Sequence, residues 1–264
     1  MCRLLGFVAH TPTTLEGLLG EDLASFTELS LKHGDGWGVA VREHDGVSVQ
    51  KSLGAARRSP EFGELTRALI TDTALVHLRW ATLGLPVTWD NAHPFTDGRV
   101  AFAHNGSIAP PEALDTLIAP DLLTRRRGDT DSERYFLALL TQLREHPDPA
   151  DALAATVEQV GHIAHSSLNA LLLTSDSLHA VCSYTAEAEA EAEEDDYYRM
   201  GYAVRDGAVI VASSGWGSGW TEMASGTILS VRRDTGALSV RDLRGRARPA
   251  PVRALSTWIE APTP

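Results

Sequence analysis

The chain opens with a residue pair that can form a nucleophile and its own base. Met1 is followed by Cys2, whose small side chain permits removal of the initiator methionine. The Cys2 thiol and the freed α-amine would then share one carbon atom. A thiol titrates near pH ~8.5 and an α-amine near pH ~8, so a proton moves readily from sulfur to nitrogen. This pairing is a form of nucleophilic catalysis. The alternative is a small apolar residue at the start of a buried strand.

Residues 76–82 are a strand-like stretch that runs into a turn. Arg79 stands where the strand ends, and Thr82 follows three positions later in the turn. Arginine binds a carboxylate through two parallel hydrogen bonds, so Arg79 is a candidate for holding a substrate carboxylate. The competing interpretation is a surface salt bridge.

A second stretch can stabilise negative charge on an oxygen atom. Asn105 and Gly106 follow an apolar run, and the Asn105 amide and the Gly106 N–H are two donors that can point to one oxygen. Such donors form oxyanion holes, in which losing one donor costs on the order of 10²–10³ in rate. Asn-Gly is also a common tight turn, which is the alternative here.

A third stretch, residues 128–133, carries several polar side chains just before a predicted helix. Capping of that helix is the default explanation. A carboxylate at Asp131 can also hold an ammonium group. A substrate with an α-carboxylate and an α-ammonium would then use Arg79 and Asp131 together.

Composition excludes several functional classes. The 264 residues include 23 basic and 35 acidic side chains, a net charge of -12 that disfavours nucleic acid as a partner. No leader-like or membrane-spanning run is present, so no membrane association is expected. With only Cys2 and Cys182, we expect a reduced, cytoplasmic protein. The ten histidines lack metal-site spacing, and neither a metal nor a cofactor is expected.

The elements that must position these residues alternate without a regular βαβ rhythm. This pattern favours two antiparallel-rich sheets packed together and covered by helices, with Cys2 at the tip of a central strand. Strands are predicted at 2–9, 74–80, 99–104, 168–174, 178–184, 198–204, 208–212, 226–232 and 237–243, and helices at 13–31, 60–70, 110–118, 131–143 and 149–160.

Three further segments carry no assigned chemistry. Residues 33–38 form a glycine-rich turn that favours close approach of backbones. Residues 186–196 are predicted to be an acidic, solvated loop or a frayed helix, and residues 244–264 a proline-containing C-terminal tail.

Taken together and in this order, the motifs resemble those of the class II glutamine amidotransferases of the N-terminal nucleophile hydrolase type. The resemblance implies one domain over 1–264, an α+β fold built as a four-layer αββα sandwich. Residues 211–226 further resemble stand-alone members, including the γ-glutamyl hydrolase of the ergothioneine pathway. The motifs that carry the family resemblance are Met1-Cys2-Arg3, Asp35-Gly36-Trp37-Gly38, Arg79-Trp80-Ala81-Thr82, Asn91-Ala92-His93-Pro94, His104-Asn105-Gly106 and Thr130-Asp131-Ser132-Glu133.

The resemblance also implies roles for single residues. Cys2 would be the nucleophile, and its own amine the base. The oxyanion would be held by Asn105 and Gly106. A glutamyl group would be bound through its α-carboxylate by Arg79, helped by Thr82, and through its α-ammonium by Asp131, with Trp80 and His93 shaping the pocket.

Two departures from the family pattern concern the pocket. Leu83-Gly84 stands where many members have a histidine before glycine, so no proton transfer is assigned there. Ser214-Gly215-Trp216 stands where stand-alone members often carry Ser-Glu-Pro, and the usual acid is missing. The leaving-group side of the pocket is therefore where this chain is expected to differ.

Three functions remain open from the sequence. The first is a cysteine amidohydrolase that cleaves the γ-amide of glutamine or a γ-glutamyl conjugate through a γ-glutamyl thioester. A true amidotransferase of this kind would need a separate acceptor or synthetase subunit. The second is a dedicated γ-glutamyl hydrolase in the synthesis of a small thiol such as ergothioneine. The third is a non-catalytic glutamyl-binding regulatory module. The sequence leaves the oligomeric state undetermined.

Overall fold

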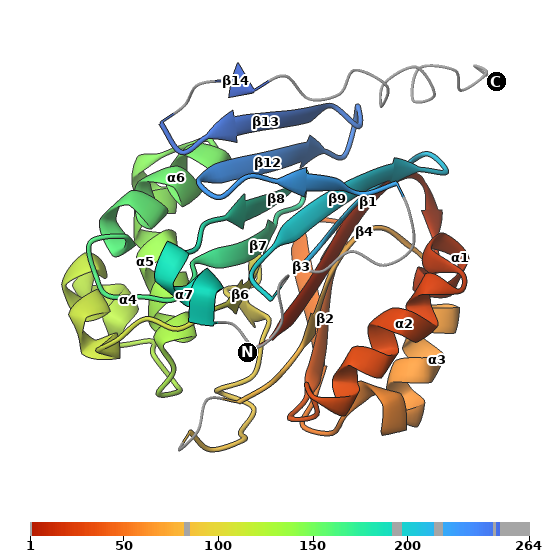
Figure 1. Cartoon of the computed structure of the whole chain (residues 1–264), viewed down its shortest axis with the longest axis horizontal. Helices are drawn as coiled ribbons and strands as arrows, with labels where there is room; N and C mark the ends of the chain where they lie inside the picture. Colours follow the sequence, from red (N-terminus) through yellow and green to blue (C-terminus); the bar gives the residue numbers. More distant parts are fainter. Residues whose placement is uncertain (1, 82–84, 192–196, 214–218, 245–246, 249–264) are drawn as a thin grey trace.

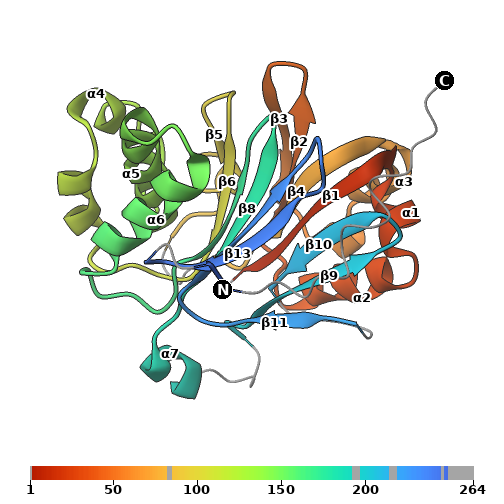
Figure 2. The ribbon, with the colours of Figure 1, turned by 90° about the horizontal axis from the view of Figure 1, so that it is seen from above.

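Two β-sheets packed face to face form the centre of the protein. The computed structural model describes residues 2–81, 85–191, 197–213, 219–244 and 247–248. In this part of the chain each sheet has seven strands, and helices cover the outer face of each sheet (Figures 1 and 2). The layers follow one another as helices, sheet, sheet and helices. The expected αββα sandwich is therefore confirmed.

The first sheet is antiparallel throughout and has β1 in its middle, between β10 and β4. Successive side chains of a strand point to opposite faces. Leu4 and Val8 accordingly face the second sheet, while Leu5 and Phe7 face the helices. In spatial order the strands are β11 (Thr221–Met223), β9 (Met200–Arg205), β10 (Ala208–Ala212), β1 (Arg3–Thr13), β4 (Thr71–Leu78), β2 (Trp37–Glu43) and β3 (Gly46–Ser52).

The second sheet is also antiparallel. Its strand β6 ends at Asn105 and pairs with β7, so that Asn105 lies opposite Asn169. In spatial order the strands are β14 (Ala247–Arg248), β13 (Leu238–Asp242), β12 (Thr227–Arg232), β8 (Ser177–Cys182), β7 (Asn169–Leu173), β6 (Ala101–Asn105) and β5 (Phe95–Thr96).

The helices form the two outer layers. The layer on the first sheet contains α1 (Leu15–Leu19), α2 (Asp22–Glu28), α3 (Pro60–Ala68) and the 3₁₀ helices η1 (Leu29–Leu31) and η2 (Ala56–Arg58). The layer on the second sheet contains η3 (Pro111–Leu117), α4 (Pro120–Leu123), α5 (Asp131–Glu145) and α6 (Pro149–Val160). A further helix, α7 (Ala186–Glu191), lies in the connection from β8 to β9.

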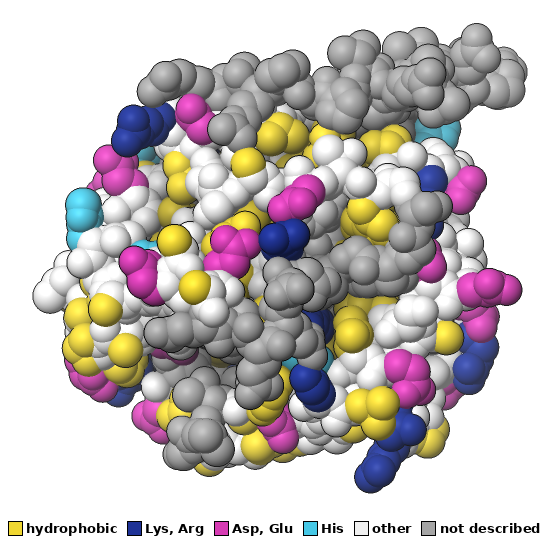
Figure 3. All heavy atoms as spheres, in the orientation of Figure 1, with side chains coloured by type: hydrophobic (Ala, Val, Ile, Leu, Met, Phe, Trp, Pro, Cys, Tyr) yellow, Lys and Arg dark blue, Asp and Glu magenta, His cyan; other side chains and the backbone are white. Residues whose placement is uncertain are grey.

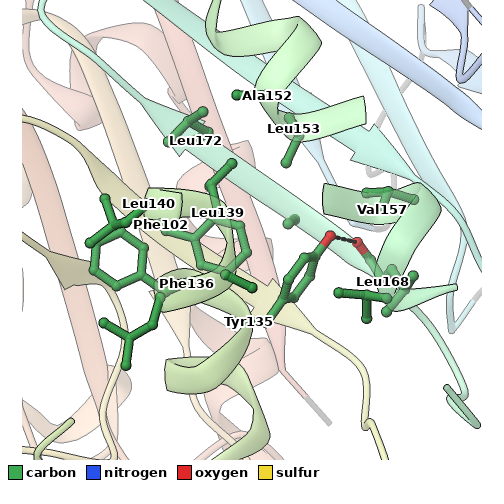
Figure 4. Packing of buried hydrophobic residues seen from close by; sticks show 14 of the residues in the cluster. Phe102, Tyr135, Phe136, Leu139, Leu140, Ala152, Leu153, Val157, Leu168 and Leu172 are labelled. Carbon is green, nitrogen blue, oxygen red and sulfur yellow. Dashed lines mark hydrogen bonds between the residues drawn. The ribbon is translucent and has the colours of Figure 1, made fainter. Parts of the chain in front are cut away.

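Each of the three interfaces between layers has its own apolar core. Figure 4 shows the core between the second sheet and its helices, where the Phe102 ring of β6 meets the Tyr135 ring of α5 edge-on at 5.0 Å. The buried Tyr135 hydroxyl donates a hydrogen bond to the Leu168 carbonyl at 3.4 Å. Burying one large apolar side chain contributes about 1.5–3 kcal/mol, so these cores hold the layers, and hence the strand ends, in place.

The predicted elements agree with the observed ones to different degrees. The helix at 149–160 and the strand at 208–212 have the predicted bounds. The span 13–31, predicted as one or two helices, is divided into three short helical pieces. The helical stretch predicted at 110–118 is the 3₁₀ helix Pro111–Leu117. For the acidic segment 186–196 the sequence leaves a solvated loop and a frayed helix open. Residues 186–191 form the helix α7, because alanine and glutamate have no strand or turn preference to compete with a helix. Of the predicted tail 244–264, only residues 244 and 247–248 lie within the described residues.

The hairpin formed by β2 and β3 was not predicted. Its strand β2 pairs with β4 and so extends the first sheet beyond the strand predicted at 74–80.

Acidic and basic side chains are interspersed over the face seen in Figure 3. Among the described residues, no helix has both the length and the apolar character needed to cross a membrane.

Candidate active site

Cys2 lies where the ends of the two sheets meet. It is buried and directly precedes β1 of the first sheet. Its backbone N–H donates to Asn105 Oδ1 of the second sheet at 2.9 Å, and its thiol donates to the Trp80 carbonyl at 3.7 Å. The predicted nucleophile is thus held by residues from two of the predicted motif stretches.

A cavity of about 360 Å³ opens beside Cys2. It combines residues from five stretches that are far apart in the sequence. The lining residues are Cys2, Arg79, Trp80, Ala81, Leu85, Asn91, His93, His104, Gly106, Ser107, Thr130, Asp131, Ser132 and Tyr198.

Asn105 is built to donate one more hydrogen bond. The residue is fully buried, and its Oδ1 is occupied by the Cys2 N–H. Its Nδ2 is buried and has no hydrogen-bond partner among the described residues. A buried donor without a partner costs about 1–3 kcal/mol and needs an explanation. An oxygen that develops negative charge beside the Cys2 sulfur would supply the missing acceptor.

Gly106 occupies a position that only glycine can fill. A Cβ atom there would lie 1.9 Å from the Ser167 carbonyl oxygen and 2.8 Å from His104 Nε2. The close approach lets the Gly106 backbone line the cavity directly after β6. This chain segment is therefore held beside Cys2 by its packing against Ser167, two residues before β7.

Arg79 is positioned by the glycine-rich turn at 33–38. The Arg79 N–H donates to the Gly36 carbonyl at 2.8 Å, and the Asp35 N–H donates to the Arg79 carbonyl at 3.0 Å. The Asp35 carboxylate also accepts from the Ala81 N–H at 2.8 Å. Gly36 has a φ of 136°, and a Cβ there would lie 2.6 Å from the Ser52 carbonyl oxygen. The interpretation of this turn as a close approach of backbones is confirmed.

Asp131 is the first residue of α5, and its carboxylate is oriented by two neighbours. Oδ2 accepts from the Ile108 N–H at 2.7 Å, and Oδ1 accepts from the Ser132 N–H at 2.8 Å. The residue that caps the helix is Thr130, whose hydroxyl accepts a hydrogen bond from the Glu133 N–H at 3.1 Å. Capping therefore leaves the Asp131 carboxylate facing the cavity with a fixed orientation.

The match of the chain to a family model decides its identity. The model of the class-II glutamine amidotransferases matches residues 1–241. The chain belongs to the class-II glutamine amidotransferases. The prediction of an amidohydrolase of the N-terminal cysteine type is confirmed at the level of this family.

Named relatives agree with the class-II assignment. A probable glutamine amidotransferase of Saccharomyces cerevisiae is 28% identical over 237 residues, which is 81% of this chain and 63% of the relative. The glutamine–fructose-6-phosphate aminotransferase of Pseudomonas syringae is 36% identical over 169 residues, 61% of this chain and 25% of the relative. The chain thus spans less than two thirds of either relative.

Solved structures show the same fold. A glutamine aminotransferase class-II domain protein from Silicibacter pomeroyi superposes with a TM-score of 0.66 at 23% identity, covering 92% of this chain and 99% of that one. The glutamine phosphoribosylpyrophosphate amidotransferase of Bacillus subtilis gives a TM-score of 0.64 at 16% identity, covering 92% of this chain and 49% of that one.

The structure brings most of the predicted site residues of this class-II protein together. One cavity is lined by Cys2, Arg79, Trp80, His93, Gly106 and Asp131. Asn105 accepts a hydrogen bond from the Cys2 N–H. Thr82, like Leu83-Gly84 and Ser214-Gly215-Trp216, lies outside the described residues. The roles given to these residues stay predictions.

Other lining residues had no assigned role. His104 and Ser132 belong to the quoted motifs and hydrogen-bond each other at 2.9 Å between Nδ1 and Oγ, a pairing that no local pattern indicates. Tyr198 comes from a distant part of the chain and carries no signal in the sequence at all. Among the described residues, no group of three or more histidine, cysteine or acidic side chains could hold a metal ion.

Burial favours the protonated form of the Cys2 thiol. Burial raises the pKa of the Cys2 thiol above its ordinary value, and the positive charges of the amino terminus and of Arg79 oppose this rise. A group that removes the proton is therefore needed for attack at neutral pH. Cys182 is a matched contrast, because burial raises the pKa of its thiol to about 12 and it lies outside the cavity.

We expect Asp131→Asn to weaken glutamine binding. The change keeps the shape of the side chain but removes the charge that faces the cavity. A hydrogen bond to a charged group contributes about 1.5–3 kcal/mol, so KM for glutamine should rise by about 10–150-fold. Steady-state kinetics measures this change. Asp129→Asn, two residues earlier and on the surface, should leave KM within about twofold; equal effects of the two variants would contradict the assignment of Asp131.

Two buried histidines adjoin the site and predict acid sensitivity. The His77 and His93 rings stack with 4.2 Å between centroids, and burial lowers the pKa of both well below 6.5. The unfolded chain binds a proton on each below pH ~6.5 while the folded protein does not, so stability falls as pH falls. Between pH 7 and 5.5 we expect a loss of about 1.3 kcal/mol per histidine.

Urea unfolding at the two pH values measures this loss. His93→Gln should reduce the loss between pH 7 and 5.5, because one titrating group is removed. His44→Gln is the matched control, since the His44 side chain is 95% exposed, and should leave the loss unchanged. A wild-type stability that does not vary over this pH range would disagree with burial of neutral histidines.

Proposed function

We propose that the chain cleaves the γ-amide of glutamine, or of a γ-glutamyl conjugate, through a γ-glutamyl thioester on Cys2. The observation that carries this proposal is the placement of Cys2, Arg79 and Asp131 around one cavity. A carboxylate-binding guanidinium and an ammonium-binding carboxylate match the two charged ends of an α-amino acid. The γ-carbonyl of that amino acid would then reach the Cys2 sulfur.

The reaction follows from these positions. After removal of Met1, the α-amine of Cys2 takes the thiol proton, and the sulfur attacks the γ-carbonyl carbon. The oxygen gains negative charge and accepts hydrogen bonds from Asn105 Nδ2 and the Gly106 N–H. The proton passes to the departing nitrogen, the C–N bond breaks, and a thioester remains. Water then attacks the thioester, releases the γ-carboxylate and restores the thiol.

The proposal extends to partners and location. As in the family, transfer of the released ammonia would need a separate acceptor or synthetase protein, whereas hydrolysis needs none. Cys2 and Cys182 are both free thiols. Because the nucleophile must stay reduced, we place the reaction in the cytoplasm.

Intact-mass spectrometry tests the proposal directly. The purified protein is measured before and after treatment with 6-diazo-5-oxo-L-norleucine, an alkylating glutamine analogue. We expect a chain without Met1 that gains one adduct, mapped to Cys2 and absent from Cys182. A chain that retains Met1 and gains no adduct would instead favour the non-catalytic glutamyl-binding module.

A further inference from the structure

The connection between β8 and β9 contains α7 and ends with Tyr197 and Tyr198. Of its described residues, Tyr198 lines the catalytic cavity. In Figures 1 and 2, α7 projects from the end of the sandwich at which β1 begins. This connection therefore approaches the site from the side of the nucleophile.

Two hydrogen bonds fasten the end of this connection beside the reacting groups. The Arg3 guanidinium donates to the Tyr197 carbonyl at 3.2 Å, and Asn169 Nδ2 donates to the Tyr198 carbonyl at 2.6 Å. Arg3 follows the nucleophile directly in sequence, and Asn169 pairs across the sheet with Asn105. Arg3 belongs to the first sheet and Asn169 to the second. The two tyrosines are thus tied to both sheets through neighbours of Cys2 and Asn105.

The fastened tyrosines belong to a small aromatic cluster, defined here as Tyr184, Tyr197, Tyr198 and Ala188. The Tyr198 ring lies 5.4 Å from the Tyr197 ring and 6.3 Å from the Tyr184 ring. The Arg3 guanidinium lies 4.6 Å from the centre of the Tyr197 ring. Tyr197 and Tyr198 are almost fully buried, so the Tyr198 side chain forms a fixed wall of the cavity.

The position of this wall indicates what it contacts, given the proposed function. Arg79 and Asp131 would hold the α-end of a glutamyl group, and Cys2 would meet its γ-carbonyl. Whatever is attached to the γ-nitrogen must then extend beyond the nucleophile. The tyrosine cluster is fastened at that end through the neighbours of Cys2 and Asn105.

We propose that Tyr198 is a specificity residue for the leaving group. The cluster offers aromatic faces and edges, which attract other rings by about 0.5–1.5 kcal/mol beyond the area that they bury. It therefore favours γ-glutamyl amides whose amine carries an aromatic ring over glutamine, from which ammonia leaves. This inference rests on the proposed function and names the class of substrate for the same site.

The test compares two substrates, L-glutamine and γ-L-glutamyl-p-nitroanilide. For each variant, the measured quantity is the ratio of kcat/KM for the anilide to kcat/KM for glutamine. We expect Tyr198→Ala to lower this ratio about tenfold or more, and Tyr198→Phe, which keeps the ring, to hold it within about twofold. Glu187→Ala on the exposed surface of α7 is the matched control and should leave the ratio unchanged.

Alkylation of Cys2 by 6-diazo-5-oxo-L-norleucine shows that each variant is folded around its glutamyl site. Where Tyr198→Ala is not alkylated, Tyr198→Leu replaces it, because leucine keeps the apolar volume without the ring. An unchanged ratio in the folded variant, or a wild-type protein that cleaves glutamine but not the anilide, overturns this inference alone. A wild-type protein that cleaves neither substrate and is not alkylated overturns the proposed function as well.

Discussion

Replacing Cys2 by alanine is expected to abolish turnover of glutamine. Among the described residues that line the cavity, Cys2 is the one whose side chain can form the proposed thioester, and its backbone N–H donates to Asn105 Oδ1. Loss of a nucleophile lowers kcat to the background rate, a decrease on the order of 10³-fold or more. Ammonia release measures this effect. The variant should still fold, because alanine fills the start of a strand that is held by its neighbours on both sides.

Cys182→Ala is the matched control for this experiment. Cys182 is also a buried free thiol, but it lies in the core between the two sheets and donates to the Met223 carbonyl at 3.6 Å. The substitution removes one sulfur from that core and should reduce stability by about 1 kcal/mol while kcat stays near its wild-type value. Retained turnover in Cys2→Ala, or equal losses in the two variants, would contradict the assignment of Cys2 as the nucleophile.

The second large effect is expected at Gly106. In Gly106→Ala the new Cβ would meet the Ser167 carbonyl oxygen at 1.9 Å, so either β6 or the residues before β7 must move. Overpacking of this kind costs about 3 kcal/mol. The same movement displaces the Gly106 N–H and Asn105, which are the proposed oxyanion donors. Activity should therefore fall on the order of 10²-fold or more.

Urea unfolding and steady-state kinetics separate the two consequences. The kinetics are measured on protein shown by its unfolding curve to be folded at the assay temperature. Gly54→Ala is the control, since the nearest atom to a Cβ there is Ser52 Oγ at 3.8 Å. That variant should match the wild type in both stability and rate. Wild-type behaviour of Gly106→Ala would show that the chain around Ser167 is less tightly packed than the distances indicate.

Local patterns were sufficient for elements that carry their own signals. The helix at 149–160 begins with Asp148 as its cap and a proline in its first turn, and these features place its start. The strand at 208–212 is a short apolar run that follows a turn at Asp206 and Gly207, both with positive φ. Such elements depend on neighbours in the sequence, so their bounds could be predicted.

Long-range pairing could not be predicted in the same way. The hairpin of β2 and β3 joins the first sheet through the pairing of β2 with β4, whose paired residues are more than thirty positions apart along the chain. The acidic segment leaves both a solvated loop and a frayed helix open, because alternating alanine and glutamate fit both. Pairing and packing decide these cases, and neither is visible in a short window of sequence.

The sequence alone predicted the family, the nucleophile and the residue types around it, because these predictions depend on short motifs whose order along the chain is distinctive. The tertiary structure decided how they act together. It placed the Asp35 carboxylate on the Ala81 N–H and brought Tyr198 to the cavity through Arg3 and Asn169. It also left Asn105 Nδ2 without a hydrogen-bond partner among the residues that the structure describes. The physical reason is that hydrogen bonds and burial depend on distances in space, which the packing of the four layers creates between residues far apart along the chain.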